Sequence, residues 1–411
     1  MPGAVRADRY SSLMSLAFDL SDPSAFESGL PHDVFRELRR DDPVHWTEEL
    51  GGRGFWTVTR HGDVSAISKD WQTFSSHTGA IMMADLPVED LAQQQLMMLN
   101  MDPPDHTKLR LIVNRAFLPR YVNHLEAHVR DLAREIIDGV IERGAGDFVT
   151  DIAMELPTQV IAEMMGVPKE DRIRLFEWSN RMIGSADPEY ARSPDDAANA
   201  AMELYMFADE LAAKRRAAPA DDLVTALLTA EVDGQSLSDL EFDLFFLLLA
   251  VAGNETTRNL LSHAMLALFE NPDQWKALVA AGETSPYAVE EFLRWGTPVM
   301  QFRRTAQQSV TLHDRTIETG DKVVIWYASA NFDEAVFVDP MRFDVARTPN
   351  QHLSFGGGGP HHCLGASLAR MEIKVMFDEI IRRLPDISQA GDAVRLRSNF
   401  IHGMKHLPVR F

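Results

Sequence analysis

A long helical pattern that begins near Ser238 constrains the fold of this chain more than any other feature of its sequence. Ser238 and Glu241 form the pattern of a capping box, and Asn271-Pro272 ends the pattern after Glu270. A helix of about 30 residues is about 45 Å long, which is roughly the full width of a globular domain of this size. We therefore expect the chain to fold around one long central helix.

The middle of this predicted helix contains an unfavourable segment, Ala252-Gly-Asn-Glu-Thr-Thr257. Glycine and threonine are poor helix formers in a helix interior, so the segment predicts a local defect in an otherwise strong helix. A single break in a locally consistent element indicates a functional site.

The rest of the chain is mainly helical in pattern. Apolar residues at spacings of three and four predict a helix over residues 121–143, which Gly144 ends. Strand patterns are few, and they do not alternate with helices as in a doubly wound sheet. They cover residues 54–59, 309–317 and 322–326. The sequence therefore predicts a mainly α fold with a small β region, in one domain over residues 1–411, with residues 1–20 as a loosely ordered tail.

Composition and charge argue against several classes of protein. The chain has 40 basic and 61 acidic residues and a net charge of −21, which disfavours attraction to nucleic acid or anionic membranes. The longest strongly apolar run, residues 244–252, is much shorter than the about 20 residues that span a bilayer. Residues 1–30 show no secretory signal pattern, and one cysteine allows no internal disulfide. We expect a cytoplasmic protein with no membrane span and no nucleic-acid partner.

The only cysteine, Cys363, lies in a glycine-rich segment that runs from Phe355 to Ala366. The segment lacks the Gly-Lys-Ser/Thr of a phosphate-binding loop and the glycine spacing of a dinucleotide-binding loop. Two adjacent histidines without a second cysteine fit a zinc site poorly. A free buried thiol stays open as the simplest alternative.

Two features of this segment favour a ligand role for the sulfur. A helical pattern begins directly after Cys363, and the positive end of a helix favours a thiolate. The glycines before the sulfur and Gly365 after it remove side-chain bulk, so a large flat group could approach the backbone. A thiolate with one open side is what an axial haem ligand requires.

The pattern Phe355-x-x-Gly358-x-x-His361-x-Cys363-x-Gly365 resembles the haem-binding signature of the cytochrome P450 superfamily. Three further motifs match this family in the expected order, and the resemblance extends from about Asp19 to Phe411. These motifs are His106-x-x-x-Arg110, Ala252–Thr257 and Glu291-x-x-Arg294. The resemblance implies a single domain of this family, with the long central helix crossing over the haem.

The resemblance also implies roles for the matched residues around the cofactor. Cys363 would be the axial ligand of haem b, an iron protoporphyrin, with dioxygen as co-substrate. Basic residues from three segments would bind the two haem propionates, and Arg304 matches the family pattern better than Arg303. The residues that would bind the propionates are His106, Arg110, Arg304 and His361. For His106, capping of its own helix remains the alternative.

The resemblance implies a proton relay for one further group of matched residues and a stabilising role for another. Glu255 and Thr256 would relay the two protons that reductive activation of dioxygen requires. Glu291, Arg294 and Arg347 would form a buried ion network with a structural role, and Glu291 would not be a catalytic acid. The alternative for Glu291 and Arg294 is an ordinary surface ion pair.

The substrate pocket is expected to form from segments 80–101, 246–252, 299–302 and 400–404. These segments are apolar and rich in methionine, which suits a bulky and irregular ligand. The predicted lining residues are Ile81, Met82, Met98, Leu99, Val251, Ala252, Val299, Met300, Phe302 and Ile401. The surrounding sequence is most similar to bacterial members that oxidise sterol side chains or terpenoids. This resemblance implies hydroxylation of an unactivated C–H bond in a steroid or terpenoid, with a fatty acid or a macrolide-type metabolite as the alternative substrate.

The electrons are expected to come from separate proteins, a ferredoxin and its reductase, because the chain has neither the length nor the cysteines for a further redox domain. Four basic residues in an otherwise acidic chain could form a docking patch for the ferredoxin or simply a solvated helix face. They are Lys108, Arg110, Arg115 and Arg120.

Two other functions stay open from the sequence. A haem-binding sensor or carrier would need Cys363 but would not need the Glu255–Thr256 pair. A cysteine hydrolase would contain no cofactor and would need a general base beside the sulfur.

Overall fold

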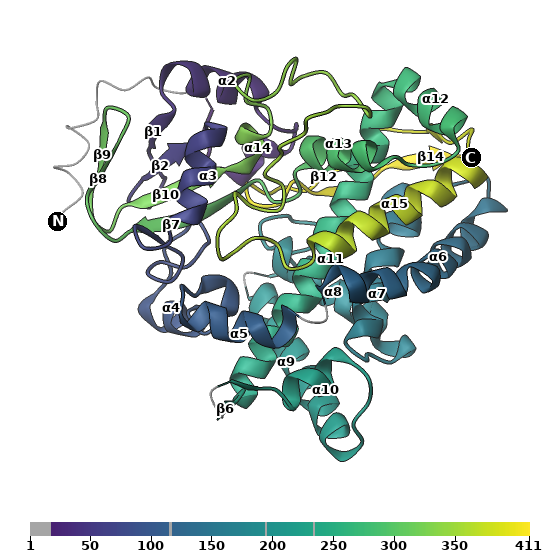
Figure 1. The fold of residues 1–411 in the computed structure, drawn as a ribbon, viewed down its shortest axis with the longest axis horizontal. Helices are drawn as coiled ribbons and strands as arrows, with labels where there is room; N and C mark the ends of the chain where they lie inside the picture. The colour runs from purple at the N-terminus through teal and green to yellow at the C-terminus, as the bar shows by residue number, and fades with distance from the viewer. Residues whose placement is uncertain (1–17, 115–116, 194, 233–234) are drawn as a thin grey trace.

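The computed structural model describes residues 18–114, 117–193, 195–232 and 235–411 (Figure 1). Helix α11 (Asp239–Glu270) contains 32 residues and runs through the middle of the molecule. Ser238 caps it, and both hydrogen bonds of the capping box with Glu241 are present. The prediction of one long central helix is therefore confirmed to within one residue at its start.

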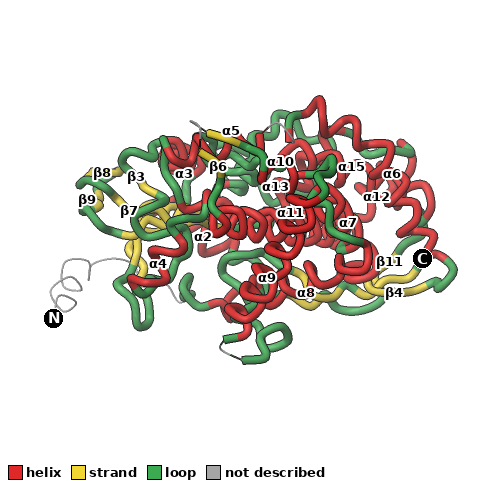
Figure 2. Tube along the Cα trace, turned by 90° about the horizontal axis from the view of Figure 1, so that it is seen from below, coloured by secondary structure: helices red, strands yellow, loops and turns green. Residues whose placement is uncertain are grey.

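Helices make up most of the fold and surround α11 (Figure 2). The other α-helices are α2 (His32–Asp41), α3 (His61–Lys69), α4 (Val88–Gln94), α5 (Asp105–Asn114), α6 (Pro119–Ile141), α7 (Glu155–Met164), α8 (Arg172–Ile183), α9 (Asp196–Ala217), α10 (Leu223–Leu228), α12 (Pro272–Ala281), α13 (Pro286–Gly296), α14 (Tyr327–Ala330) and α15 (Ala366–Arg383). Short helical turns cover Pro23–Phe26, Met98–Asn100, Val149–Ala153 and Lys169–Asp171. The helix predicted over residues 121–143 is α6, shifted by two residues toward the N-terminus.

The largest sheet has five strands in the order β1-β2-β10-β7-β3. Its strands are β1 (Val44–Thr47), β2 (Phe55–Val58), β3 (Phe74–Ser75), β7 (Gln301–Ala306) and β10 (Lys322–Trp326). Smaller sheets are formed by β4 (Ala145–Asp147), β5 (Glu231–Val232), β6 (Gln235–Ser236), β8 (Val310–Leu312), β9 (Arg315–Ile317), β11 (Ser388–Gln389), β12 (Val394–Arg395), β13 (Met404–His406) and β14 (Pro408–Arg410). The mainly α fold with a small β region is confirmed.

The strand expected over residues 309–317 is instead a hairpin. Strands β8 and β9 pair antiparallel, with Val310 opposite Ile317. His313 takes a left-handed backbone conformation at φ 52°, which turns the chain between them. Apolar and polar residues continue to alternate through this turn, and the sequence analysis therefore predicted one strand instead of two.

The buried apolar residues form three clusters: one large helical core and two smaller clusters beside the five-stranded sheet, which we together call the sheet-side core. The helical core surrounds α11, which packs against α7, α8, α9 and α13. Side chains are buried all around α11, as expected for a helix in the centre of a large domain. Within the described residues, no helix combines the length and apolar character needed to cross a membrane.

The prediction of a loose tail over residues 1–20 falls largely on residues 1–17, which lie outside the described part of the chain. Leu20 is fully buried in a core cluster with Phe26 and Trp326, and Phe18 packs against that cluster. The chain is therefore already part of the core at residues 18–20.

Candidate functional site

The glycine-rich loop before Cys363 packs directly on helix α3. A Cβ atom at Gly357 would lie 2.5 Å from Ser68 Oγ, and one at Gly359 would lie 2.6 Å from the Ser68 carbonyl oxygen. Gly356, Gly358 and Gly359 also have positive φ angles of 92°, 95° and 76°. These glycines therefore allow a tight turn against α3, whereas the sequence attributed them to clearance around the sulfur. A Cβ at Gly365, in contrast, would meet open space.

Cys363 lies deep in the protein, yet its side chain has an exposed face. Its backbone N–H donates to Phe355 O at 2.9 Å, which closes the loop. Helix α15 begins at Ala366 with Gly365 as its N-cap, two residues later than the sequence predicted. The backbone N–H of Gly365 still donates a hydrogen bond to the sulfur.

Burial raises the pKa of the Cys363 thiol, and the Gly365 amide, Arg110 and Arg370 only partly oppose this effect. The amide at the helix N-terminus lowers the pKa of the thiol, as the sequence analysis expected, but desolvation outweighs it in the protein alone. A metal ion bound to the sulfur would reverse this balance, since a coordinating thiol is deprotonated. A raised pKa also disfavours the hydrolase alternative, which needs an activated nucleophile.

Near the sulfur, four nitrogen-bearing side chains have no anionic partner among the residues that the structure describes. Arg304 is 3% exposed; its guanidinium donates to Arg303 O at 2.8 Å and, among the described residues, pairs with no carboxylate. The rings of His106 and His361 lie 4.4 Å apart, and His106 Nδ1 and His361 Nε2 are buried without a hydrogen-bond partner. Arg110 donates to the carbonyl oxygens of Pro360 and His362. We call His106, Arg110, Arg304 and His361 the cationic cradle, after its two guanidinium groups; burial lowers the pKa of both imidazoles, which are therefore neutral hydrogen-bonding groups.

The cationic cradle fits the two carboxylates of a haem. Burial lowers the pKa of Arg304, and burial with the charge of Arg110 lowers the pKa of His106 to about 4. A buried guanidinium without a carboxylate is unfavourable, and an anion placed there would relieve this cost. The exposed face of Cys363 beside this cradle is therefore suited to a flat, dianionic metal macrocycle.

Helix α11 continues without interruption through the segment where the sequence predicted a defect. Thr256 Oγ1 donates to Ala252 O at 2.8 Å, one turn earlier. A Cβ at Gly253 would approach Ile161 of α7 to 3.0 Å, so this glycine allows the two helices to pack closely. Ala252 is nonetheless exposed in the middle of a buried helix, which shows that α11 borders an internal space there.

Glu255 is 1% exposed and ion-paired, whereas the sequence analysis expected a carboxylate connected to solvent. Its Oε2 accepts from Arg258 Nη2 at 2.5 Å, and Oε1 is buried without a partner. Arg258 Nη1 also donates to Asn180 Oδ1 of α8 at 2.8 Å. Burial raises the pKa of Glu255, although Arg258 opposes this shift. The sequence analysis missed Arg258 and Asn180, and only the spacing of three from Glu255 to Arg258 could have indicated the first.

A hydrogen bond between Thr257 and Glu372 connects α11 with α15, the helix that follows Cys363. Burial raises the pKa of Glu372 to about 8, with the Thr257 hydroxyl opposing the shift. This contact places the Glu255–Thr256 segment beside the helix that carries the cysteine loop.

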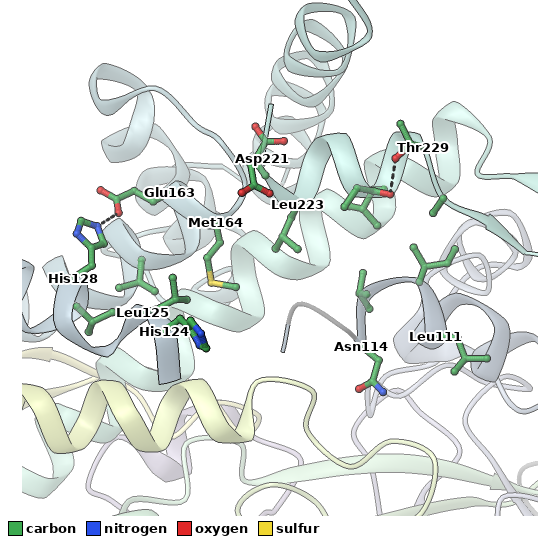
Figure 3. A pocket seen from close by; sticks show the side chains of 18 of the residues that line it. Leu111, Asn114, His124, Leu125, His128, Glu163, Met164, Asp221, Leu223 and Thr229 are labelled. Atoms are coloured by element: carbon green, nitrogen blue, oxygen red, sulfur yellow. Dashed lines mark hydrogen bonds and ion pairs between the residues drawn. The ribbon is translucent and has the colours of Figure 1, made fainter. Parts of the chain in front are cut away.

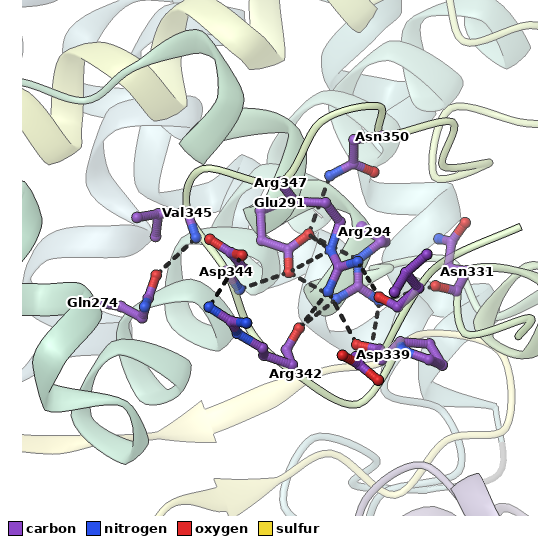
Figure 4. A network of polar contacts seen from close by, with 12 residues as sticks. Gln274, Glu291, Arg294, Asn331, Asp339, Arg342, Asp344, Val345, Arg347 and Asn350 are labelled. Atoms are coloured by element: carbon purple, nitrogen blue, oxygen red, sulfur yellow. Dashed lines mark hydrogen bonds and ion pairs between the residues drawn. The ribbon is translucent and has the colours of Figure 1, made fainter.

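Glu291 lies at the centre of a buried polar network (Figure 4). Its carboxylate accepts two hydrogen bonds of 2.8 Å from Arg294, and both side chains are fully buried. Arg347 Nε donates to it at 3.1 Å, as does Asn350 Nδ2, and the backbone N–H of Asp344 donates at 2.9 Å. The network connects α13 to the irregular segment before the cysteine loop.

The predicted pocket segments meet in space, although their residues differ in burial. Val299 forms an isolated bridge with Ile401, the rings of Phe302 and Phe400 lie 5.6 Å apart, and Arg303 N donates to Ile81 O at 2.9 Å. Val251, Leu99, Val299 and Phe302 are partly exposed, and Ala252 and Met82 are exposed. Ile81, Met98, Met300 and Ile401 are buried. Met300 packs in the sheet-side core with Trp326, and Met98 packs in the helical core.

Of the four basic residues considered for ferredoxin docking, the structure describes the side chains of Lys108 and Arg110, so the docking patch stays a prediction. Arg110 points inward to the cysteine loop, and Lys108 lies 3.7 Å from Asp105. Arg115 lies outside the described residues, and the side chain of Arg120 is not described.

A large open pocket lies elsewhere, between α5, α6, α7 and α10 (Figure 3). Its volume is about 1460 Å³, and its lining includes Leu111, His128, Glu163 and Leu223. It shares no residue with the cationic cradle or the cysteine loop, and we assign it no part in the chemistry.

Comparisons with known proteins agree with this site. The family model described as Cytochrome P450 matches residues 22–281 and 286–396. A steroid C26-monooxygenase from Rhodococcus jostii is 44% identical over 96% of this chain and 84% of its own. A methyl-branched lipid omega-hydroxylase from Mycobacterium bovis is 43% identical over 94% of this chain and 92% of its own.

A solved structure gives the same result for the fold. The cytochrome P450 of Mycobacterium marinum in complex with pseudoionone aligns with a TM-score of 0.91 at 42% identity, over 97% of this chain and 99% of that one. The exposed sulfur, the cationic cradle beside it and these matches over nearly the whole chain lead to one conclusion: the chain belongs to the cytochrome P450 family.

Proposed function

We propose that this protein hydroxylates an unactivated C–H bond of a steroid or a similarly bulky, methyl-branched lipid. The observation that carries the proposal is the identity of 44% and 43%, across nearly the whole chain, with two monooxygenases named for such lipids. The exposed apolar residues of α11 and of the adjoining segments, such as Ala252 and Met82, support it, because they offer contact to an apolar ligand.

The chain's own residues would hold haem b and manage protons. When bound, the haem iron supplies the redox chemistry by which dioxygen, two electrons and two protons convert R–H to R–OH and water. Cys363 would bind the iron, and the cationic cradle would bind the propionates. The Thr256 hydroxyl would pass protons toward the reacting oxygen, and Glu255 would supply them through its unpartnered Oε1 while Arg258 fixes Oε2.

We further propose that the two electrons come from a ferredoxin and its reductase. Cys363 is the only cysteine of the chain, so the chain offers no set of thiolates for an iron–sulfur cluster of its own. Because the chain carries a net charge of −21, we expect an acidic ferredoxin to dock only at a local basic surface, and the segment around Lys108 is the candidate for it.

Optical titration of the haem-loaded protein tests the substrate class. A steroid that displaces water from the iron should shift the main haem absorption band with saturable affinity, and the fully reduced system should then yield a hydroxylated steroid. A small linear fatty acid serves as the comparison ligand. Saturable binding of the fatty acid without any response to steroids or methyl-branched lipids would refute the proposed substrate class.

Replacing Thr256 with alanine tests the proton relay. The change removes the hydroxyl that bonds Ala252 O and leaves the neighbouring Glu255–Arg258 pair in place. We expect the product formed per reducing equivalent to fall by about tenfold or more, with the difference released as reduced oxygen species. Thr256→Ser should retain most of the coupling. Unchanged coupling in Thr256→Ala would remove Thr256 from the relay and would leave open a haem carrier or sensor.

A further inference from the structure

Arg303 and Arg304 are neighbours on β7, and their side chains lie on opposite faces of the strand. Arg304 belongs to the cationic cradle, whereas Arg303 contacts the chain segment that follows residue 79. Its Nη1 lies 2.9 Å from Asp85 Oδ1 and 3.2 Å from Ala84 O. Arg303 is 2% exposed, so its guanidinium contacts Asp85 and Ala84 of that segment rather than solvent.

Glycine at position 79 makes room for this arrangement. A Cβ atom at Gly79 would lie 2.2 Å from Arg303 Nη2, so any larger residue would displace the guanidinium. The backbone N–H of Arg303 also donates to Ile81 O at 2.9 Å. Strand β7 therefore holds the segment from both its backbone and its side chain.

Three basic side chains contact the carboxylate of Asp85. Arg53 donates to its carboxylate at 2.9 and 3.1 Å, Lys322 Nζ lies 3.4 Å away, and Arg303 contacts it as described. The β7–β10 register pairs Arg303 with Val324, so Lys322 lies two residues away on the same face of the sheet. Burial opposes ionisation of Asp85, but the three cations outweigh it and lower its pKa to about 2.

The segment after Asp85 has little other attachment. Helix α4 (Val88–Gln94) lies at the edge of the fold (Figure 1). It buries none of its residues, and Val88 is 84% exposed. The segment is attached again from Gln95 onward: Gln95 Nε2 donates to His77 O at 2.9 Å, and Met97 is buried. Asn100 is also buried, and its side chain bonds Ile81 N and Gln94 O at 3.1 and 2.9 Å. Residues 86–97 therefore form a surface flap, fixed at one end by the Asp85 cluster and at the other by Asn100.

This flap borders the proposed substrate site. Ile81 lies directly before the Asp85 cluster and is joined to β7, next to Arg304 of the cationic cradle. Beyond Asn100, the backbone oxygen of Met101 accepts a hydrogen bond from His361. Both ends of the flap are thus connected to the walls of the haem site.

We propose that Asp85, Arg303 and Lys322 form an ionic latch that holds this flap closed and sets how readily bulky apolar ligands enter and leave the site. The inference rests on the proposed function, since it concerns access to the same pocket. The three residues are positioning residues: they touch no substrate, and they act through the flap. Arg303 and Lys322 are both buried, and Lys322 also forms an ion pair with Glu49. Among the described residues, Asp85 is the one carboxylate that pairs with Arg303, so without Asp85 Arg303 would have to seek solvent and carry the flap with it.

Asp85→Asn tests the latch, because Asp85 is half-exposed and the substitution preserves its size. Dissociation of a bulky imidazole-bearing azole from the haem-loaded protein should become at least about tenfold faster, a change of about 1.4 kcal/mol. Binding of free imidazole, which needs no flap contact, should stay unchanged. Backbone hydrogen exchange of residues 86–97 should speed up by a similar factor, and Asp85→Glu should restore both rates.

Asp138→Asn is the matched control, because Asp138 also joins two distant parts of the chain by pairing with Arg383, but far from the flap. It should leave azole dissociation and exchange of residues 86–97 unchanged. Equal azole dissociation in Asp85→Asn and wild-type protein would overturn the latch. A lowered melting temperature with unchanged azole and exchange rates would also overturn it, because it would show a merely structural role. Failure of both steroids and methyl-branched lipids to bind the wild-type protein would instead refute the proposed function and leave the azole test intact.

Discussion

Cys363→Ala should abolish the strongly red-shifted absorption band that a reduced haem-thiolate protein shows with carbon monoxide. Cys363 is the only cysteine of the chain; its side chain is exposed, and Arg110 of the cationic cradle acts on its thiol. Without the thiolate, electron donation that favours O–O cleavage is lost. We expect product formation to fall by more than about a thousandfold, which corresponds to about 4 kcal/mol of transition-state stabilisation. Difference spectroscopy and product analysis on equal amounts of bound haem measure both effects.

The matched control is His362→Ala. His362 is adjacent to Cys363 and exposed, and Arg110 uses its backbone oxygen rather than its ring. This variant should keep the red-shifted band and most of the activity. If Cys363→Ala retained the band, the sulfur would not be the iron ligand, and the cysteine loop would have no direct part in holding the haem.

Local signals in the sequence predicted the elements whose ends they mark. The capping box at Ser238 and the proline at 272 fixed α11 nearly to the residue, because capping and proline sterics act within one turn. The start of α15 was placed two residues early, because the helical spacing of Leu364 and Leu368 extends backward across the N-cap Gly365. The β8–β9 hairpin was missed because a turn at His313 leaves the alternation of side chains intact.

The candidate site shows the same limit at longer range. Motif residues at fixed short spacing, such as His106 with Arg110, could be proposed from the sequence because a helix places them together. Asn180 lies 78 residues from Arg258, and Arg303 lies more than 200 residues from Asp85. No periodicity relates such pairs, so only the folded chain reveals that Glu255 pairs with a buried arginine and that Arg303 pairs with Asp85.

Glu291→Gln should destabilise the protein by about 3–5 kcal/mol, because breaking one end of a buried ion network leaves uncompensated charge. The Glu291 carboxylate accepts hydrogen bonds from Arg294, Arg347, Asn350 and the backbone of Asp344, and it is fully buried. A neutral amide would direct its own N–H groups at the fully buried guanidinium of Arg294 and at the partly exposed guanidinium of Arg347. Chemical denaturation of the haem-loaded protein, followed by loss of helical signal, measures the change.

Asp33→Asn provides a control with nearly the same geometry and a different environment. Asp33 and Arg36 are also three residues apart on a helix, with a nitrogen–oxygen distance of 2.9 Å against 2.8 Å for Glu291 and Arg294, but Asp33 is 86% exposed. Its loss should change stability by less than about 0.5 kcal/mol. Because spacing and distance match, the difference between the two variants reports the combined effect of burial and of the additional partners of Glu291. Equal effects of the two substitutions would contradict a structural role for the network, and a loss of activity in Glu291→Gln at unchanged stability would instead give Glu291 a direct part in the chemistry.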